Sequence, residues 1–204
     1  MYYGSPSSFF VSQTSFELLH CEFVAIGEAW KNEIYPDQVT AIRRISKDLY
    51  KSNPKIQIYL RVHPNLASVE NDRKTSMLSL KSPNLTIIAP DADIDTYQLM
   101  RSCEKVATFG SSVGSEAVYW GIPSVLLGPC LYQGLGGVYR TNSHEHTLDL
   151  LSNSLEPQEK TGALKYGFWF QTRGYPHQYY TPTGLFDGQF KGQTIYAQLP
   201  KLSP

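Results

Sequence analysis

Residues 110–112, Gly-Ser-Ser, are small and carry two hydroxyl groups, and they lie where an apolar run is followed by a helical pattern. The surrounding stretch, Thr108 to Gly128, reads "TFGSSVGSEAVYWGIPSVLLG". Gly110 would let a ligand approach the backbone, and Ser111 and Ser112 would add two hydroxyl donors. The unpaired amides and the dipole at the start of the following helix attract negative charge. This combination predicts a cradle for a phosphate or another anion.

Ordinary helix capping is the alternative explanation of these serines. A serine at the N-cap accepts a hydrogen bond from a backbone N–H of the first turn, with no ligand involved. One cap needs only one serine, and with Ser112 as the cap, Glu116 lies one residue beyond the position of a reciprocal capping box. We therefore favour the anion cradle and expect Glu116 to bind the hydroxyls of a ribose beside the phosphates.

His63 lies at the end of another predicted strand, in the stretch "RVHPN". The ring of Pro64 biases His63 toward an extended backbone, which holds the imidazole at the carboxyl edge of that strand. Because the ordinary pKa of histidine is near neutrality, His63 could donate a hydrogen bond to a leaving phosphate or protonate it. A histidine that caps a neighbouring helix, or is hydrogen-bonded within a loop, remains the alternative.

A third polar segment, "GPCLYQGLGGVY", follows the last apolar run and has four glycines within its first ten residues. Such a backbone could fold over a substrate, with Tyr132 as a stacking group or a hydroxyl donor. A flexible surface loop fits these residues equally well.

Two groups of potential metal ligands are assigned other roles. The stretch "DADID" lacks the glycine and the terminal glutamate of a calcium loop, and its last residue, Asp95, has the spacing of a helix cap before Gln98. The stretch "HEH", residues 144–146, lies in a polar segment where such pairs are usually solvated. We expect no metal site.

The elements that must position these residues alternate between strand and helix up to about residue 155. The predicted strands are residues 9–13, 56–62, 85–90, 105–110 and 124–128, and the predicted helices are residues 38–51, 69–80, a helix opened by Asp95, and 113–119. Strands separated by helices imply parallel crossovers. The expected fold class is therefore α/β, a three-layer Rossmann-like, mostly parallel sheet with helices on both faces.

The chain changes character after Leu155. Ten of its aromatic residues lie between Tyr166 and Tyr196, with many glycines and prolines among them. We expect a Rossmann-like domain over residues 1–155, and over residues 156–204 an aromatic-rich helix, about 158–172, with a tail that packs on this domain or on a missing one.

Composition excludes several function classes. Eighteen basic and eighteen acidic side chains cancel among 204 residues, so no net charge draws the chain to nucleic acid. The three cysteines have no metal-site or disulfide-framework spacing, which favours a reducing cytoplasm. No apolar run reaches the ~20 residues that cross a bilayer.

The ordered set "RVHP", "DTYQLM", "TFGSSVGSEAVYWGIPSVLLG" and "LYQGLGG" resembles bacterial capsule polysaccharide synthesis proteins. This group includes sugar transferases that use CMP-linked acidic sugars. More widely, the segment from about residue 11 to 151 is similar to the carboxyl-terminal half of GT-B glycosyltransferases. Its His-Pro and Ser-Ser pairs are similar to the nucleotide- and phosphate-binding motifs of bacterial sialyltransferases and Kdo transferases.

The resemblance implies roles for individual residues. His63 would contact the nucleotide or its phosphate, and Ser111 and Ser112 would bind phosphate oxygens. Ser12 and Gln13, after the first strand, would line the floor of the cleft nearest the ligand. The nucleotide sugar is then a substrate, with CMP-linked donors as candidates, and no separate cofactor is implied.

One departure from the resembling enzymes concerns the other half of their fold. GT-B enzymes bind between two Rossmann-like domains, and the acceptor and usually the catalytic base come from the amino-terminal one. This chain begins at or just before the second domain. The expectation is therefore a fragment, one subunit of a split enzyme, or a remnant that binds nucleotide without turnover.

The sequence leads to a nucleotide-sugar-binding module of a glycosyltransferase in capsule or surface polysaccharide synthesis. It would act on a glycan or lipid-linked acceptor in the cytoplasm, near the inner membrane through its partners, once completed by a second domain or subunit. A nucleotide-sugar 2-epimerase, a glycerophosphotransferase-like enzyme and a non-catalytic nucleotide-binding or assembly subunit are the alternatives.

Overall fold

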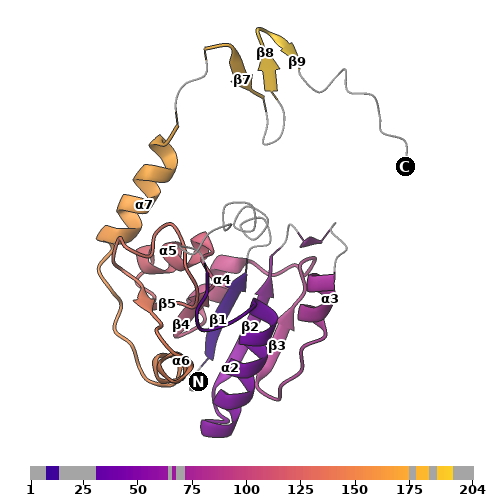
Figure 1. Cartoon of the computed structure of the whole chain (residues 1–204), viewed down its shortest axis with the longest axis vertical. Helices are drawn as coiled ribbons and strands as arrows, with labels where there is room; N and C mark the ends of the chain where they lie inside the picture. Colours follow the sequence, from indigo (N-terminus) through magenta and orange to yellow (C-terminus); the bar gives the residue numbers. More distant parts are fainter. Residues whose placement is uncertain are drawn as a thin grey trace, which may run out of the picture. The chain divides into compact units, whose positions relative to one another are not determined.

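The computed structural model describes residues 8–13, 31–63, 66–67, 72–174, 178–183 and 188–194. Its contacts divide the chain into two units, one extending to Phe168 and the other beginning at Trp169. The first contains the large sheet and the helices α2 to α6 (Figure 1).

The first unit alternates strands and helices along the chain. The strands are β1 (Ser8–Gln13), β2 (Gln57–Val62), β3 (Leu85–Ile88), β4 (Lys105–Thr108), β5 (Ser124–Leu126) and β6 (Tyr139–Arg140). The helices are α2 (Gln38–Ser52), α3 (Asp72–Leu78), α4 (Thr96–Arg101), α5 (Ser112–Tyr119), α6 (His144–Ser152) and α7 (Thr161–Thr172), of which α7 continues into the second unit.

All six strands are parallel and follow the order β3-β2-β1-β4-β5-β6. This is the strand order of the doubly wound dinucleotide-binding fold, in which the connections run in opposite directions from the first strand. The predicted three-layer Rossmann-like α/β fold is confirmed.

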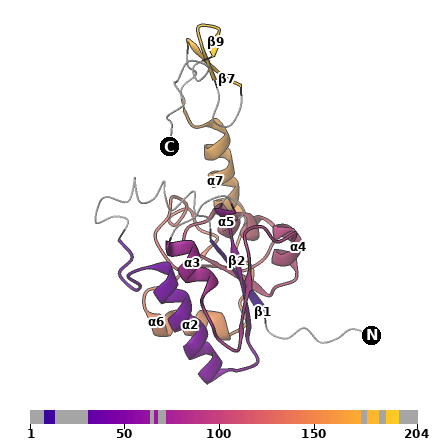
Figure 2. The same cartoon turned by 90° about the vertical axis from the view of Figure 1, so that its right-hand side faces the viewer.

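Apolar helix faces cover both sides of the sheet. On one side α2 packs beside α3 and α6, and α4 and α5 lie on the other side (Figure 2). There Met100 of α4 and Ala117 of α5 form a cluster with Val106 of β4. Parallel sheets need this double cover because both of their faces are apolar.

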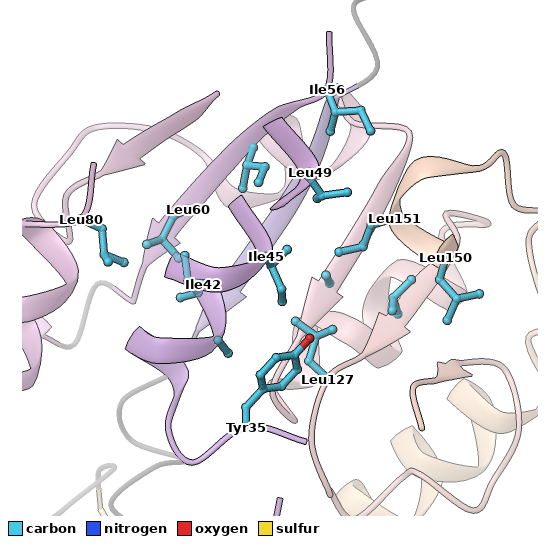
Figure 3. Packing of buried hydrophobic residues seen from close by; sticks show 14 of the residues in the cluster. Tyr35, Ile42, Ile45, Leu49, Ile56, Leu60, Leu80, Leu127, Leu150 and Leu151 are labelled. Carbon is cyan, nitrogen blue, oxygen red and sulfur yellow. The ribbon is translucent and has the colours of Figure 1, made fainter. Parts of the chain in front are cut away.

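The larger core lies under α2 and α6. In α2 the residues Ile42, Ile45 and Leu49 recur at helical spacing, and each is at most 3% exposed. They meet Leu127, which follows β5, and Leu151 of α6 (Figure 3). Full burial of each such side chain contributes about 1.5–3 kcal/mol.

Helix α6 and strand β6 were not predicted, because this part of the sequence is polar and its hydrophobic pattern is too short to identify an element. Ser143 caps α6 by accepting a hydrogen bond from the His146 amide at 3.0 Å. At the other end the ammonium of Lys105, 3% exposed, donates to the carbonyls of Leu150 and of two neighbouring residues, Leu151 and Asn153. A buried lysine thus satisfies carbonyls that the helix end leaves unpaired.

Other boundaries differ from the prediction by a few residues. Asp95 caps α4 as predicted, because its carboxylate accepts from the Gln98 amide at 2.7 Å. The predicted start of a helix at Val69 lies outside the described residues, and α3 itself spans Asp72–Leu78.

The glycine-rich segment after β5 packs against the first turn of α7. Gly162 of α7 approaches so closely that an added Cβ would lie 2.0 Å from the carbonyl oxygen of Gly136. Tyr166, one turn further along α7, packs with Tyr132, Leu126 and Cys130. The beginning of α7 is therefore part of the first unit.

The second unit contains a small antiparallel sheet that the sequence did not predict. It consists of β7 (Tyr180–Pro182), β8 (Gly188–Phe190) and β9 (Gln193–Thr194). Lys191 and Gly192, both with positive φ, make the two-residue turn between β8 and β9, and the Lys191 ammonium lies 4.9 Å from the centre of the Tyr179 ring. The division predicted at residue 155 stays a prediction.

The contact between Gly162 and Gly136 predicts opposite effects for two substitutions in α7. Gly162→Ala forces its Cβ into the backbone carbonyl of Gly136, and we expect the free energy of unfolding to fall by about 1–3 kcal/mol or more. Gly167→Ala meets no atom within 4 Å and should stabilise the helix by roughly 0.5–1 kcal/mol. Urea unfolding of both variants measures the difference, and equal stabilities would contradict this packing.

Candidate functional site

The strand pairing brings three predicted site segments to one edge of the sheet. Ser12 of β1 is paired with Arg61 of β2 on one side and with Thr108 of β4 on the other. His63 follows the end of β2, and Gly110 follows the end of β4. Adjacent strands lie about 4.8 Å apart, so the backbones of these two residues are separated by roughly 10 Å at the carboxyl edge.

The Gly110–Ser112 turn has a backbone that favours glycine at its first position. Gly110 has φ +105°, and an added Cβ would also lie 3.0 Å from the Cβ of Cys130. A side chain at this position would therefore be strained and crowded. The turn brings the chain from β4 directly into the first turn of α5.

The cap of α5 is Ser111 rather than Ser112. The Ser111 hydroxyl, on a residue that is 3% exposed, accepts from the Val113 amide over a long 3.4 Å, and the Ser111 carbonyl accepts from the Gly114 amide at 3.0 Å. Ser112 is partly exposed at the first helical position, and neither its amide nor its hydroxyl has a hydrogen-bond partner among the residues the structure describes. The two serines therefore differ in environment, since Ser111 is buried as the cap of α5 and Ser112 is partly exposed.

Tyr132 supports this turn from beneath, which corrects the prediction of a stacking group. Its ring is 2% exposed and packs edge-on against Tyr166 with the ring centres 5.1 Å apart. Its hydroxyl donates to the Ser111 carbonyl at 2.6 Å and lies 3.3 Å from the hydroxyl of Thr108. The apolar surroundings favour burial of the ring, so Tyr132 holds the Gly110–Ser112 turn in place.

His63 is half-buried, and its environment favours the neutral imidazole. Burial lowers the pKa of His63 below its ordinary 6.5, and the nearby positive charge of Arg61 lowers it further. A neutral ring has one donor nitrogen and one acceptor nitrogen. Donation of a hydrogen bond to an anion is thus the better supported of the two roles expected from the sequence.

Ser12 and Gln13 are the last two residues of β1, between His63 and Gly110 in strand order. The structure describes them by their backbone, so their contact with a ligand stays a prediction. Pro64 and Asn65, which complete the His-Pro motif, lie outside the described residues.

Glu116 lies one helical turn after Ser112, on the same face of α5. Its carboxylate oxygen Oε2 accepts a hydrogen bond of 2.8 Å from the hydroxyl of Tyr97 on α4. Sequence reasoning placed Glu116 at the site but missed Tyr97, because the contact joins two helices that are separated by a strand.

A pocket of about 360 Å³ lies one strand further along the same edge, at the ends of β5 and β6. It shares Pro129 with the cradle, since the Pro129 carbonyl oxygen lies 3.2 Å from where a Cβ on Gly110 would stand. Its lining is polar and includes two cations, one carboxylate and several amides, from Lys31, Asn32, Glu33, Gln133, Arg140 and Asn142. Sequence reasoning did not single out these residues.

Hydrogen bonds between distant segments hold the walls of this pocket. The Asn32 side-chain amide donates to the Leu127 carbonyl at 2.9 Å, and its oxygen accepts from the amides of Ile34 and Tyr35 at 3.0 Å. Next to this wall, the Tyr35 hydroxyl is hydrogen-bonded to Nδ1 of buried His144 at 2.9 Å, and Nε2 of His144 lies 3.3 Å from the Asp48 carboxylate. His144 is therefore engaged in a structural chain of hydrogen bonds.

No group of three or more potential ligands that could hold a metal occurs in the described part of the chain. Within the same residues, no helix is both long and apolar enough to cross a membrane.

A family model described as capsule polysaccharide biosynthesis protein matches residues 31–156, which is more than half of the chain. No match was found among curated proteins. Similar solved structures include Thermosulfurimonas dismutans KpsC, a beta Kdo 2,7 transferase, with 17% identity and a TM-score of 0.45 over 70% of this chain and 40% of that protein.

Two further structures are described as UDP-GlcNAc 2-epimerases. The putative enzyme of Listeria monocytogenes has 16% identity and a TM-score of 0.48 over 85% of this chain and 47% of that protein. The Methanocaldococcus jannaschii enzyme has 14% identity and a TM-score of 0.46 over 83% and 47%. The chain thus spans less than half the length of each of these three proteins.

The lowered pKa of His63 predicts how stability depends on pH. The unfolded chain binds a proton at His63 more readily than the folded chain does. The contribution of neutral His63 to the free energy of unfolding is therefore fully present above about pH 6.5, and it is lost as the pH falls through the lower pKa of the folded state. We expect His63→Gln to lose less stability than the wild type between about pH 7.5 and about pH 5.5. Thermal unfolding at several pH values measures this, and parallel curves for the two proteins would show that His63 is not desolvated.

Proposed function

The chain belongs to the capsule polysaccharide biosynthesis protein family, and on this basis we propose that it is the nucleotide-sugar-binding module of a glycosyltransferase. Its product would be a bacterial capsule or surface polysaccharide. The observation that carries the proposal is the edge where β2, β1 and β4 end, because His63 and the Gly110–Ser112 turn flank the same central strand there. Ligands of such sheets bind where the connections change direction.

In this proposal the phosphate of the donor lies at the start of α5. The amide and hydroxyl of Ser112 bind its oxygens, and the dipole of α5 adds the equivalent of about half a positive charge. Ser111 contributes through its cap, since its own hydroxyl is buried. Glu116, one turn further, accepts hydrogen bonds from the ribose hydroxyls.

The chemistry that these residues assist is departure of the nucleotide. When the bond between the anomeric carbon and the phosphate oxygen breaks, its electron pair stays on that oxygen. Hydrogen-bond donors already aimed at this oxygen stabilise the charge as it develops. His63, with its lowered pKa, donates to the phosphate as a neutral imidazole.

The pocket beside the cradle would hold the remainder of the donor. Its volume of about 360 Å³ is within the range of small-molecule sites, and its amides and charged groups suit a ligand rich in hydroxyls. Arg140, the last residue of β6, and Gln133, in the loop after β5, both line it, so it could contact a sugar ring from more than one side.

The acceptor and a catalytic base would come from a second domain or subunit. The acceptor class is a glycan or lipid-linked glycan, and the module would work in the cytoplasm, close to the inner membrane through its partners. Transfer by this chain without a partner is not expected.

Substitution of Ser112 tests the cradle. We expect the purified chain to bind at least one of CMP, CDP and UDP, and Ser112→Ala to weaken that binding about tenfold, because a hydrogen bond to a charged group is lost. Ser52→Ala, which removes a hydroxyl from the last residue of α2, should bind like the wild type. Isothermal titration calorimetry gives the dissociation constant of the wild type and of each of the two variants.

Two results would overturn the proposal. One is a wild-type chain that binds none of the three nucleotides, and the other is a Ser112→Ala variant that binds as tightly as the wild type. Conversion of UDP-GlcNAc without any acceptor would identify an epimerase instead. Transfer to an acceptor by the chain alone would remove the need for a second domain.

A further inference from the structure

Tyr97 and Glu116 form a contact that the proposed function does not use. The Tyr97 hydroxyl donates to Oε2 of Glu116 at 2.8 Å, although Tyr97 is 46% exposed and could bond to water instead. A carboxylate has two oxygens with several acceptor directions. The contact occupies one oxygen and restricts the rotation of the side chain about its last bonds.

Hydrogen bonds fix the backbone around Tyr97, and this restricts where its side chain can lie relative to Glu116. Tyr97 is the second residue of α4, directly after the Asp95 cap. The loop that leads to this cap is bound by buried Arg61, whose guanidinium donates to the carbonyls of Ala89, Ala92 and Ile94. Arg61 is 4% exposed and belongs to β2, so the position of Tyr97 is linked to the sheet itself.

The electrostatics keep Tyr97 a donor. Its hydrogen bond to Glu116 and the negative charge of that carboxylate raise the pKa of Tyr97 above its ordinary 10.0. The phenol therefore stays protonated at all physiological pH values. Its only hydrogen-bonding role toward a carboxylate is to donate, which leaves the other oxygen of Glu116 to accept from a ligand.

We propose that Tyr97 is a positioning residue that orients the Glu116 carboxylate to accept from the 2′-hydroxyl of a ribonucleotide. This inference rests on the proposed function, in which Glu116 binds the ribose. Tyr97 acts through Glu116 and does not itself need to touch the ligand. Its contribution therefore appears only with ligands that carry the 2′-hydroxyl and only while Glu116 is present.

The test compares ribonucleotides with their 2′-deoxy counterparts. Binding of CMP, 2′-deoxy-CMP, UDP and 2′-deoxy-UDP to the full 204-residue chain is measured by calorimetry for the wild type, Tyr97→Phe, Glu116→Gln and the double variant. Tyr97→Phe should weaken binding of the ribonucleotide about two- to tenfold, as expected for one lost hydrogen bond, and leave the deoxynucleotide unchanged. In the Glu116→Gln background Tyr97→Phe should have no further effect.

Tyr119→Phe is the matched control. It makes the same chemical change on a tyrosine that is 50% exposed and lies in α5 itself, three residues after Glu116. Its ratio of ribonucleotide to deoxynucleotide affinity should equal that of the wild type. Thermal unfolding checks that all variants are folded.

The failure of this inference is distinguishable from the failure of the proposed function. If Glu116→Gln removes the preference for ribose and Tyr97→Phe does not reduce it, Tyr97 is a surface hydrogen bond and only the inference is wrong. If Tyr97→Phe weakens both nucleotides equally, its role is structural and the inference is again wrong. If the wild type binds a nucleotide with no preference for ribose, the ribose contact of Glu116 and the role of Tyr97 are both overturned.

Discussion

The parallel pairing of β1 with both β2 and β4 is the constraint on which the rest of the structure depends. The connections that follow β1 and β2 run toward β3, and those that follow β4 and β5 run toward β6. The loops after β2 and β4 therefore lie on either side of β1. Helices then cover both faces, and the ends of β2, β1 and β4 lie at the same edge of the sheet. Because of this strand order, His63 and the start of α5 follow strands on either side of β1, although the two segments are almost fifty residues apart in the chain.

The polar side chains at the Gly110–Ser112 turn have different contacts. Ser111 and Tyr132 are buried and bind each other through a carbonyl and a hydroxyl, while Ser112 is partly exposed. A buried hydroxyl must find a partner, since an unpaired one costs free energy. Tyr132 meets this requirement and at the same time holds the turn that shapes the cradle. The hydrogen bonds of His144 to Tyr35 and Asp48 similarly give a buried histidine its partners.

The site uses side chains from helices on the α4–α5 face and from loops on both sides of β1. Arg61 extends this connection, because it reaches from β2 to the loop that carries α4. Tyr97 then meets Glu116 across the α4–α5 contact. A ligand at this edge would touch α5, but the orientation of its contacts depends on residues in β2 and α4. The chain belongs to the capsule polysaccharide biosynthesis protein family, and the anionic, ribose-containing ligand is our proposal for this edge.

The sequence by itself determined the fold class and the strand-to-helix turn at Gly110–Ser112, because both follow from local rules, whereas anion binding at this turn stays a prediction. Apolar runs of strand length alternate with helical periodicity, and a Gly-Ser-Ser turn before a helix has a strong local signal. Strand β6 and helix α6 escaped prediction, since a two-residue strand and a polar helix start have no such periodicity. Only the tertiary structure decided that Ser111 caps, that Tyr132 is buried and that Tyr97 binds Glu116. Those facts depend on which surfaces meet after the sheet has formed, and spacing along the chain does not contain them.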